Sequence, residues 1–552
     1  MSARLPNRRI RLLLVFFVLA FGGAFGRAVW LQAVQAQPLD RLARGQHHAT
    51  VELPAARGAI LDRNGVDLAI GRQAITVYAN PRHVPDPRAT AIAAGRALHI
   101  DPDRLYGKLA DRSHGFVYIA RKADPKRARA LKALNLTGLG FYPEERRAYP
   151  QGAVAAHVLG YAGVDNHGLA GLELALDRTL AGRNGRQTIV RDPRGRTLDV
   201  LSTVAPVEGR NVRLTLDNTL QANAQSVLLR TVRQWGAKAA TAVVLDPRNG
   251  DVLAMASEPG FDANRFPQTD RDVQRNRTVT DTYEPGSTLK VVTVAGALSE
   301  GLVTPSTQFS LEPSIHVADR VIHEAHRTRT ERMTVADILS RSSNVGTITL
   351  AELLGRPRLE AWVDRFGFGK KTGIDFPGET AGILPFYWSG STIGTLPIGH
   401  GIAVTPVQMA AAYAAVANGG VWLRPRLVVG HPTKRRRVMS RAVSQQLMSM
   451  LRDVVIEGTG TEAEVEGYQV AGKTGTAAKP DPRGGYSKSR YVASFVGVVP
   501  ASAPRLVVLV TVDEPRSGIF GGTVAAPAFQ QIARFDLQYL EVPPDATLES
   551  GQ

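Results

Sequence analysis

The sequence predicts an α+β protein that starts with a membrane-spanning helix and continues into two folded domains. Three observations lead to this prediction. A chain of 552 residues is too long for one ordinary hydrophobic core. An apolar run lies close to the N-terminus, and β-rich runs at both ends of the second half enclose mostly helical sequence. Strands that enclose a helical insertion are typical of one mixed domain with a central antiparallel sheet.

The N-terminal apolar run begins after a basic flank. Arg8, Arg9 and Arg11 precede the apolar residues 12–26, and Arg27 interrupts the run before residues 28–34 continue it. Because an arginine near the end of a span can reach the headgroups, we expect a transmembrane anchor over 12–34 and a cytoplasmic tail over 1–11. A signal peptide cleaved near Ala24 is the alternative. In both cases the rest of the chain is exported.

The first domain is expected over 35–209, where short extended segments alternate with Gly/Pro turns. Residues 57–65 predict a strand and a tight turn at Asn64-Gly65, and residues 177–185 predict a helix end followed by a glycine turn. This region shows no cluster of acid, base and nucleophile. We therefore interpret it as a structural or docking module.

The second domain is expected over 210–542, and its strands and helices follow from residue patterns. Asn249-Gly250 joins two apolar runs as a hairpin. The predicted strands cover 212–216, 241–246, 252–256, 491–499 and 506–512, and the predicted helices cover 219–235 and most of 287–450. The polar residues 543–552 are expected to be a disordered tail.

Composition limits the possible partners and cofactors. The formal net charge is +18, which suits either nucleic acid or an anionic lipid or polymer surface. No basic run is interleaved with aromatic residues as single-strand binders require, and Lys434-Arg435-Arg436-Arg437 stands alone, so we expect no nucleic-acid partner. The absence of cysteine excludes disulfides and thiolate metal sites. We expect no metal and no organic cofactor.

The first motif with chemistry is Ser287-Thr288-Leu289-Lys290, which follows a turn at Pro285-Gly286 and opens a predicted helix. Residues three apart share one face of a helix, so Lys290 is expected beside the Ser287 hydroxyl. A serine hydroxyl needs a nearby base to act as a nucleophile, and a lysine serves only if its pKa is lowered. Taken alone, such a motif is more often a capped helix with an exposed lysine.

Two further motifs follow in the same domain. Ser342-Ser343-Asn344 combines a hydroxyl and an amide at a predicted helix end, although by itself it would be interpreted as a helix cap. Lys473-Thr474-Gly475-Thr476 precedes the last strand pair, where an edge strand with a cation and hydroxyls can hold a carboxylate. A second Lys-Thr-Gly at Lys371 lies in loop sequence, and Pro377 soon after it excludes a central strand, so we interpret this copy as a decoy. The three ordered motifs are the signature of penicillin-recognising serine enzymes.

The sequence resembles the division-specific class B penicillin-binding proteins, the FtsI family. The resemblance covers nearly the whole chain from the anchor to about residue 540. Beyond the three motifs, it rests on these residues: Arg57-Gly58, 62–65, 156–160, Gly168, Gly171, Glu173, 283–290, 342–346, 399–401, Thr405-Pro406, 457–461, 470–476, Gly521-Gly522 and Ala526-Pro527. Elongation-class relatives commonly carry Asp at the position of Asn344, so Asn favours division.

The resemblance implies an elongated pedestal domain, also named the penicillin-binding protein dimerisation domain, followed by a transpeptidase domain. It implies that Ser287 is the nucleophile, Lys290 its base and Ser342 a proton relay. Asn344, Lys473, Thr474, Gly475 and Thr476 would bind the substrate, and the backbone N–H groups of Ser287 and Thr476 would form the oxyanion hole. Peptidoglycan stem peptides would be the substrate, and an FtsW-like SEDS glycan polymerase and other divisome proteins would be partners in the bacterial inner membrane, at the septum.

Several alternatives stay open. An elongation or sporulation paralogue would look similar, and so would a D,D-carboxypeptidase or a scaffold that binds penicillin without turnover. A β-lactamase needs a positioned carboxylate for deacylation, and we find no Glu-x-x-x-Asn of that kind after Ser342. The spacing in His323-Glu324-Ala325-His326 does not match a His-Glu-x-x-His zinc site, so we expect a solvated turn or strand there.

Overall fold

The computed structural model describes residues 6–34, 48–191, 197–325 and 329–546. By the contacts between residues, the chain forms two compact units, and each is described separately below. The first unit combines residues 1–56 with 182–209, and the second combines 57–181 with 210–552. The domain boundaries predicted at residues 35, 210 and 543 stay predictions.

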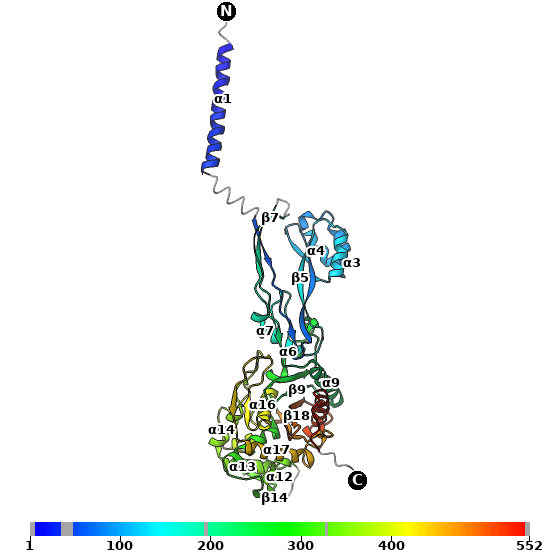
Figure 1. The fold of residues 1–552 in the computed structure, drawn as a ribbon, viewed down its shortest axis with the longest axis vertical. Helices are drawn as coiled ribbons and strands as arrows, with labels where there is room; N and C mark the ends of the chain where they lie inside the picture. The colour runs from blue at the N-terminus through cyan, green and yellow to red at the C-terminus, as the bar shows by residue number, and fades with distance from the viewer. Residues whose placement is uncertain (1–5, 35–47, 192–196, 326–328, 547–552) are drawn as a thin grey trace, which may run out of the picture. The chain divides into compact units, whose positions relative to one another are not determined.

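The first unit contains the predicted anchor and a small sheet. Helix α1 (Pro6–Val29) continues into a π-helical turn (Trp30–Val34), and the stretch Arg8–Ala33 is long and apolar enough to cross a membrane (Figure 1). Its apolar side chains are exposed, as expected for a helix whose solvent is lipid. The three strands β1 (His48–Leu53), β6 (Gly185–Arg191) and β7 (Thr197–Val204) pair antiparallel in the order β1-β6-β7. These features support a single-pass membrane anchor.

The second unit begins with a five-stranded sheet. The Asn64-Gly65 turn joins β2 (Ile60–Leu61) to β3 (Asp67–Ala79), and Gly65 has the positive φ of 90° that was expected of this hairpin. The remaining strands of the sheet are β4 (Val117–Ala123), β5 (Leu139–Ala148) and β8 (Val212–Arg213). Helices α3 (Pro87–Leu98), α4 (Pro102–Ala110) and α5 (Pro125–Ala133) form a small core with β3 and β4.

A buried ion network joins segments of this region that are far apart in sequence. The carboxylate of Glu173, which is fully buried, accepts from Arg57 Nε at 2.8 Å and from Arg147 Nε at 2.6 Å. Arg57 Nη1 also pairs with Asp177 at 2.6 Å. A buried carboxylate requires such partners, so this network fixes the packing of the chain around residues 57, 147 and 173.

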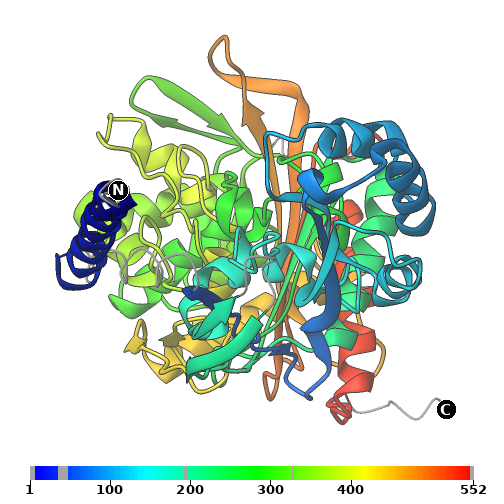
Figure 2. The same cartoon turned by 90° about the horizontal axis from the view of Figure 1, so that it is seen from above.

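The central sheet of the second unit is antiparallel, in the order β10-β9-β19-β18-β17. The strands are β9 (Ala239–Leu245), β10 (Val252–Glu258), β17 (Ala471–Pro480), β18 (Tyr486–Val499) and β19 (Leu506–Asp513). Helices α9 (Asn218–Trp235) and α19 (Ala526–Tyr539) pack on one face, and the helical insertion packs on the other. Figure 2 shows the orange strands between the yellow-green insertion and the red C-terminal helix.

The insertion is mostly helical, as predicted, but it also contains short strand pairs. Its helices are α11 (Lys290–Ser299), α12 (Val335–Ser340), α13 (Asn344–Leu354), α14 (Arg356–Phe366), α15 (Thr392–Thr395), α16 (Pro406–Ala417) and α17 (Arg441–Ile456). The strand pairs join β11 (Gln308–Leu311) to β14 (Glu331–Thr334), β12 (Ser314–Val317) to β13 (Arg320–His323), and β15 (Val421–Leu423) to β16 (Arg435–Arg437). These strands have three or four residues each, too few for periodicity to detect.

The predicted fold class, α+β with an antiparallel sheet and a helical subdomain, is confirmed. The strand predicted over 212–216 is shorter than expected, because β8 contains two residues and Leu214 forms only an isolated bridge with Val428. In the tail, Asp545 accepts hydrogen bonds from Gln469 N at 2.7 Å and Ser502 Oγ at 2.5 Å. The prediction of disorder for residues 547–552 lies outside the described residues.

Candidate active site

The segment that carries Ser287 is a single turn of 3₁₀-helix, Gly286–Leu289, which leads into α11. The helix predicted through residues 291–298 is confirmed, although Ser287 itself lies in the tighter turn. The Thr288 hydroxyl donates to Pro285 O at 2.8 Å, and Tyr413 Oη donates to Thr288 O at 2.9 Å. These bonds fix the backbone on both sides of Ser287, whose side chain is partly exposed.

Two glycines allow this turn to lie directly against the edge strand β17. Gly286 has a φ of 54°, and a Cβ atom there would lie 2.9 Å from Thr476 O. A Cβ atom on Gly475 would lie 2.4 Å from Ser494 Oγ and 2.8 Å from Pro285 O. Since such distances exclude larger side chains, glycine at both positions lets the backbones approach. The first and third motifs therefore meet at this contact.

Lys290 joins the first motif to the second. Its Nζ atom donates to Asn344 Oδ1 at 2.7 Å, to Ser342 O at 2.5 Å and to Ser342 Oγ at 3.2 Å. Lys290 is fully buried, and burial lowers its pKa to about 7, an effect that the negative charge of Glu324 partly opposes. Within the described residues, no hydrogen bond joins Lys290 Nζ to Ser287 Oγ. The second motif thus holds the amine in place, and burial gives it a pKa suited to proton transfer near neutral pH.

The second motif lies between two helices. After α12 ends, Ser342 adopts a left-handed φ of 61°, and Ser343 caps α13 by accepting from Gly346 N at 2.9 Å. Taken by itself, this motif was interpreted from the sequence as a helix cap, and Ser343 does form that cap. The neighbouring residues Ser342 and Asn344 instead turn toward Lys290, so the motif forms both a cap and a contact with the buried amine.

Glu324 is a site residue that the sequence interpretation missed. Its carboxylate accepts from Ser343 Oγ at 2.5 Å, from Asn344 N at 3.1 Å and from Val345 N at 3.0 Å. An anion at these N–H groups satisfies donors at the start of α13. We expected a solvated turn or strand at residues 323–326, and His323 is the exposed last residue of strand β13, but Glu324 is half-buried and contacts α13. His326 lies outside the described residues. No local pattern indicates a contact across about 20 residues.

The third motif lies on β17, which is an edge strand as predicted. Lys473 is fully buried, and its Nζ atom has no hydrogen-bond partner among the described residues. Burial and then the charge of Lys290 lower the pKa of Lys473 well below its usual value. Thr474 Oγ1 lies 2.6 Å from Thr459 Oγ1, and Thr476 Oγ1 accepts from Gly521 N at 3.0 Å. A buried cation-forming group without a partner is suited to an anionic ligand.

The Lys371 copy of Lys-Thr-Gly lies in a loop, as predicted, away from these contacts. Thr372 is buried there, and its N–H donates at 2.7 Å to Glu379 Oε1, while Gly373 N donates at 3.0 Å to Glu379 Oε2. Glu379 is itself buried. This copy therefore closes a loop through its threonine and glycine.

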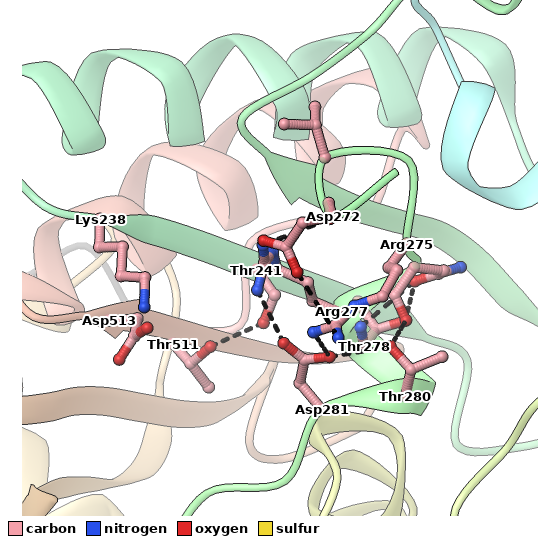
Figure 3. A network of polar contacts seen from close by, with 12 residues as sticks. Lys238, Thr241, Asp272, Arg275, Arg277, Thr278, Thr280, Asp281, Thr511 and Asp513 are labelled. Carbon is pink, nitrogen blue, oxygen red and sulfur yellow. Dashed lines mark hydrogen bonds and ion pairs between the residues drawn. The ribbon is translucent and has the colours of Figure 1, made fainter. Parts of the chain in front are cut away.

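A polar network supports the chain just before the segment that carries Ser287. Figure 3 shows Arg277 between Asp272 and Asp281, with N–O distances of 2.6 and 2.8 Å, and Arg275 on the second carboxylate at 2.7 Å. These residues line a cavity of about 580 Å³ whose wall includes Tyr283 and Glu284. Ion pairs at this point fix the short helix α10 (Arg277–Thr280), from which the chain continues to Ser287.

Glu284, three residues before Ser287, connects this segment to two others. Its carboxylate accepts from His400 Nδ1 at 2.9 Å, from Gly401 N at 3.0 Å and from Tyr486 Oη at 3.1 Å.

Among the described residues, no group of three or more histidine, cysteine, aspartate or glutamate side chains could hold a metal ion.

The site thus combines a partly exposed serine, two buried lysines and an edge strand. The chain is also similar to known protein families. Residues 240–534 match the penicillin binding protein transpeptidase domain, and residues 52–214 match the penicillin-binding protein dimerisation domain. The chain belongs to the penicillin-binding protein transpeptidase family. The resemblance stated from the motifs is therefore confirmed, and the protein is a serine enzyme of the penicillin-binding type.

Individual relatives match over almost the full chain. The peptidoglycan D,D-transpeptidase FtsI of Escherichia coli K12 is 33% identical over 98% of this chain and 93% of that protein. Stage V sporulation protein D of Bacillus subtilis is 36% identical over 98% of this chain and 86% of that protein. A crystal structure of penicillin binding protein 3 from Mycobacterium tuberculosis superposes with a TM-score of 0.68 at 32% identity, covering 90% of this chain and 99% of that one.

Proposed function

We propose that this protein is a peptidoglycan D,D-transpeptidase that cross-links stem peptides of the septal wall through a serine acyl-enzyme. The observation that carries the proposal is the position of Lys290, a buried amine bonded to Ser342 and Asn344 in the same site as the partner-free Lys473. This arrangement offers a base, a proton relay and an anion-binding group beside one serine. The names of the FtsI and PenA relatives support the substrate.

In the first half of the reaction, Ser287 Oγ attacks the carbonyl carbon between the last two D-alanines of a donor stem, and neutral Lys290 accepts the hydroxyl proton. Backbone N–H groups of Ser287 and Thr476 stabilise the oxyanion, where loss of one donor typically costs about 10²–10³ in rate. The C–N bond then breaks, Ser342 passes a proton to the leaving amine, and D-alanine departs. Ser287 is left as an ester of the shortened stem.

In the second half, an amine of a neighbouring stem attacks the ester carbonyl. A new amide forms, the Ser287–acyl bond breaks, and the serine regains its proton. Asn344 orients the donor through its amide, while Lys473, Thr474 and Thr476 bind the terminal carboxylate, with Gly475 admitting the substrate backbone. Attack by water in place of the amine gives carboxypeptidase activity, which is the nearest competing outcome.

The remaining proposals concern placement. The N-terminal helix anchors the protein in the inner membrane with its start in the cytoplasm, and residues 35–209 form a pedestal that docks an FtsW-like polymerase and other divisome proteins. The 36% identity to a sporulation protein favours a second candidate, a role in spore wall synthesis. Depletion in growing cells separates the two, because a division enzyme gives filaments and a sporulation enzyme leaves septation intact.

Labelling with a fluorescent penicillin tests the catalytic proposal. Wild-type protein should form a stable adduct on Ser287, located by mass spectrometry of a digest, and Ser287→Ala should not be labelled. An adduct on another residue, or labelling of Ser287→Ala at the wild-type rate, would contradict the assignment. Release of D-alanine with joining of two stems, measured on lipid-linked precursor, distinguishes the transpeptidase from a scaffold that only binds penicillin.

A further inference from the structure

Three adjoining hollows surround the short hairpin of β15 and β16, away from the motif residues. Their volumes are about 820, 310 and 410 Å³. They adjoin because Arg437 lines the first and second, and Trp422 and Arg436 line the second and third. We call their combined lining the basic groove.

The groove is strongly cationic. Each of the three hollows is lined by five lysine or arginine side chains. Asp364 is the one carboxylate in the described lining, and it pairs with Lys370. Two more cations have carboxylate partners nearby, Arg248 with Asp246 at 2.6 Å and Arg424 with Asp375 at 3.6 Å. The other cations lie close to one another without paired charge in the described chain, which raises the free energy of the surface until an anion binds.

Several guanidinium groups in the groove retain unused donors. The Nε atoms of Arg452 and Arg505, which both line the largest hollow, are buried and have no hydrogen-bond partner among the described residues. The Nε atom of Arg424, which lines the third hollow, is also buried and has no hydrogen-bond partner among the described residues. Because these Nε atoms are out of contact with solvent, a ligand in the hollows would be bound by the exposed cations of the lining instead. Guanidinium groups match carboxylate and phosphate oxygens with two parallel bonds, so the exposed arginines of the lining are suited to oxyanions.

Arg436, which lines the second and third hollows, is held in place by two contacts within the protein. Arg436 lies over the Trp422 ring at 4.5 Å from its centroid, and it also donates to the carbonyl of Arg365. Trp422 is buried, so its face is not available for stacking with a nucleobase. The surface is hollowed, whereas binding to a lipid surface favours exposed apolar side chains beside the cations. These features favour an extended, carboxylated chain over nucleic acid or a membrane.

We propose that the basic groove binds a second strand of the peptidoglycan polymer through the free carboxylates of its stem peptides. The inference rests on the proposed function, in which every donor stem ends in a carboxylate, so that a strand repeats this charge along its length. Binding at the groove would keep nascent polymer on the enzyme between successive acylation events. It also gives the isolated run Lys434-Arg435-Arg436-Arg437, which the catalytic mechanism does not use, a role on the surface.

The test measures binding of fluorescently labelled, uncross-linked peptidoglycan strands to the full chain in detergent, with Ser287→Ala in every sample to prevent turnover. The test variant combines Lys434→Gln, Arg435→Gln and Arg441→Gln, three exposed side chains for which no hydrogen bond or ion pair is described. The matched control combines Lys132→Gln, Arg332→Gln and Arg534→Gln, which are exposed elsewhere. We expect the Kd of the test variant to rise about tenfold at about 0.05 M NaCl and the control to stay within about twofold.

Two further measurements identify the ligand chemistry. Amidation of the strand carboxylates should weaken wild-type binding as much as the triple substitution does, and it should have little further effect on the variant. A labelled single-stranded oligonucleotide and phosphatidylglycerol in the micelles serve as competing anions. The proposal would be overturned if the test and control variants bound the strands with equal Kd, or if amidation left wild-type binding unchanged. It would also be overturned if the oligonucleotide or phosphatidylglycerol bound more tightly than the strands and lost that binding in the test variant.

Penicillin acylation of the chain with Ser287 intact is measured in parallel. Absence of acylation counts against the proposed function, whereas normal acylation with no groove-dependent strand binding counts against the groove alone. The two failures are therefore distinguishable.

Discussion

Among single residues of the site, the two buried lysines, Lys290 and Lys473, each make it less favourable for the other to carry a positive charge. Burial lowers the pKa of both, and the charge of Lys290 lowers that of Lys473 further. Two ammonium groups in one enclosed site repel, so protonation of one disfavours protonation of the other. This coupling makes a neutral lysine available near pH 7 without any metal or cofactor in the proposed steps.

The pH dependence of acylation follows from this coupling. Because the pKa of Lys290 is lowered to about 7, the neutral base is present above that pH and is lost as the pH falls. We expect the second-order rate of penicillin acylation to rise with pH, with a midpoint near 7, and then to level. Stopped-flow measurement between about pH 5 and about pH 9 checks this, since an ordinary lysine would place the midpoint near 10. A flat profile would show that Lys290 is not the base.

Glu324 should set that midpoint. Its charge raises the pKa of Lys290, and its oxygens bind the start of α13, so we describe it as a positioning residue. Glu324→Gln removes the charge and should move the midpoint to lower pH, with a loss in limiting rate of up to about 2 kcal/mol, or roughly thirtyfold, for the weakened cap. Glu324→Asp should restore the midpoint. A purely structural role would lower the rate of both variants and leave the midpoint unchanged.

The two copies of Lys-Thr-Gly should respond differently to loss of the lysine. Lys473→Ala removes a charge-assisted bond to the substrate carboxylate, worth roughly 1.5–3 kcal/mol or more, so acylation should fall at least about tenfold. Lys371→Ala should stay within a few-fold of wild type in the same penicillin assay, because its loop is held by Thr372 and Gly373. Equal losses would mean that the wrong copy has been assigned.

At the scale of elements, the packing of α9 against α19 contains a buried acid. Asp536 is fully buried, and its Oδ1 atom accepts a long hydrogen bond of 3.5 Å from Asn223 Nδ2. Its Oδ2 atom has no partner in the described chain. Burial, together with the charge of Asp217, raises its pKa well above the usual value. The helix pair is therefore most stable when this carboxyl group is neutral.

Substitution of Asp536 tests this element. Because its folded pKa is raised, the stability it contributes is complete below the unfolded pKa of about 3.9 and is lost as the pH rises through the folded value. Asp536→Asn should raise the free energy of unfolding at about pH 8 by about 1–3 kcal/mol and flatten its pH dependence. Denaturant titrations between about pH 5 and about pH 8 measure this change. A wild-type stability that rises over this interval while the variant stays flat would contradict it.

At the scale of the whole molecule, the proposed catalytic residues all follow Arg210, and the region before it supplies anchoring and packing. A soluble protein that begins at Ala36 should bind penicillin at close to the wild-type rate, because the helix affects encounter with substrate and not the chemical barrier. When exported, it should fail to support division. Labelling in vitro and complementation of a depleted strain measure the two properties. Normal septation by this protein at wild-type abundance would contradict the anchoring argument.

Much of the fold and part of the site could be predicted from the sequence. Local signals were sufficient for the anchor, the Asn64-Gly65 and Asn249-Gly250 hairpins and the helix of residues 218–235, because turn chemistry and side-chain periodicity act over a few neighbours. The short strands of the helical insertion were missed because three or four residues carry no measurable period.

Three motifs were enough to identify the family, because their order and residue types can be read from the sequence without coordinates. Their local surroundings also favoured an edge strand at Lys473 and a loop at Lys371, as the structure has them. Residue patterns did not predict that Lys290 bonds to Ser342 and Asn344, that Glu324 binds the start of α13, or that cations distant in sequence line one groove. Such contacts depend on the packing of helices and strands that lie tens or hundreds of residues apart. Local propensity contains no information on that distance, whereas burial in the packed core sets both the partners and the pKa of each lysine.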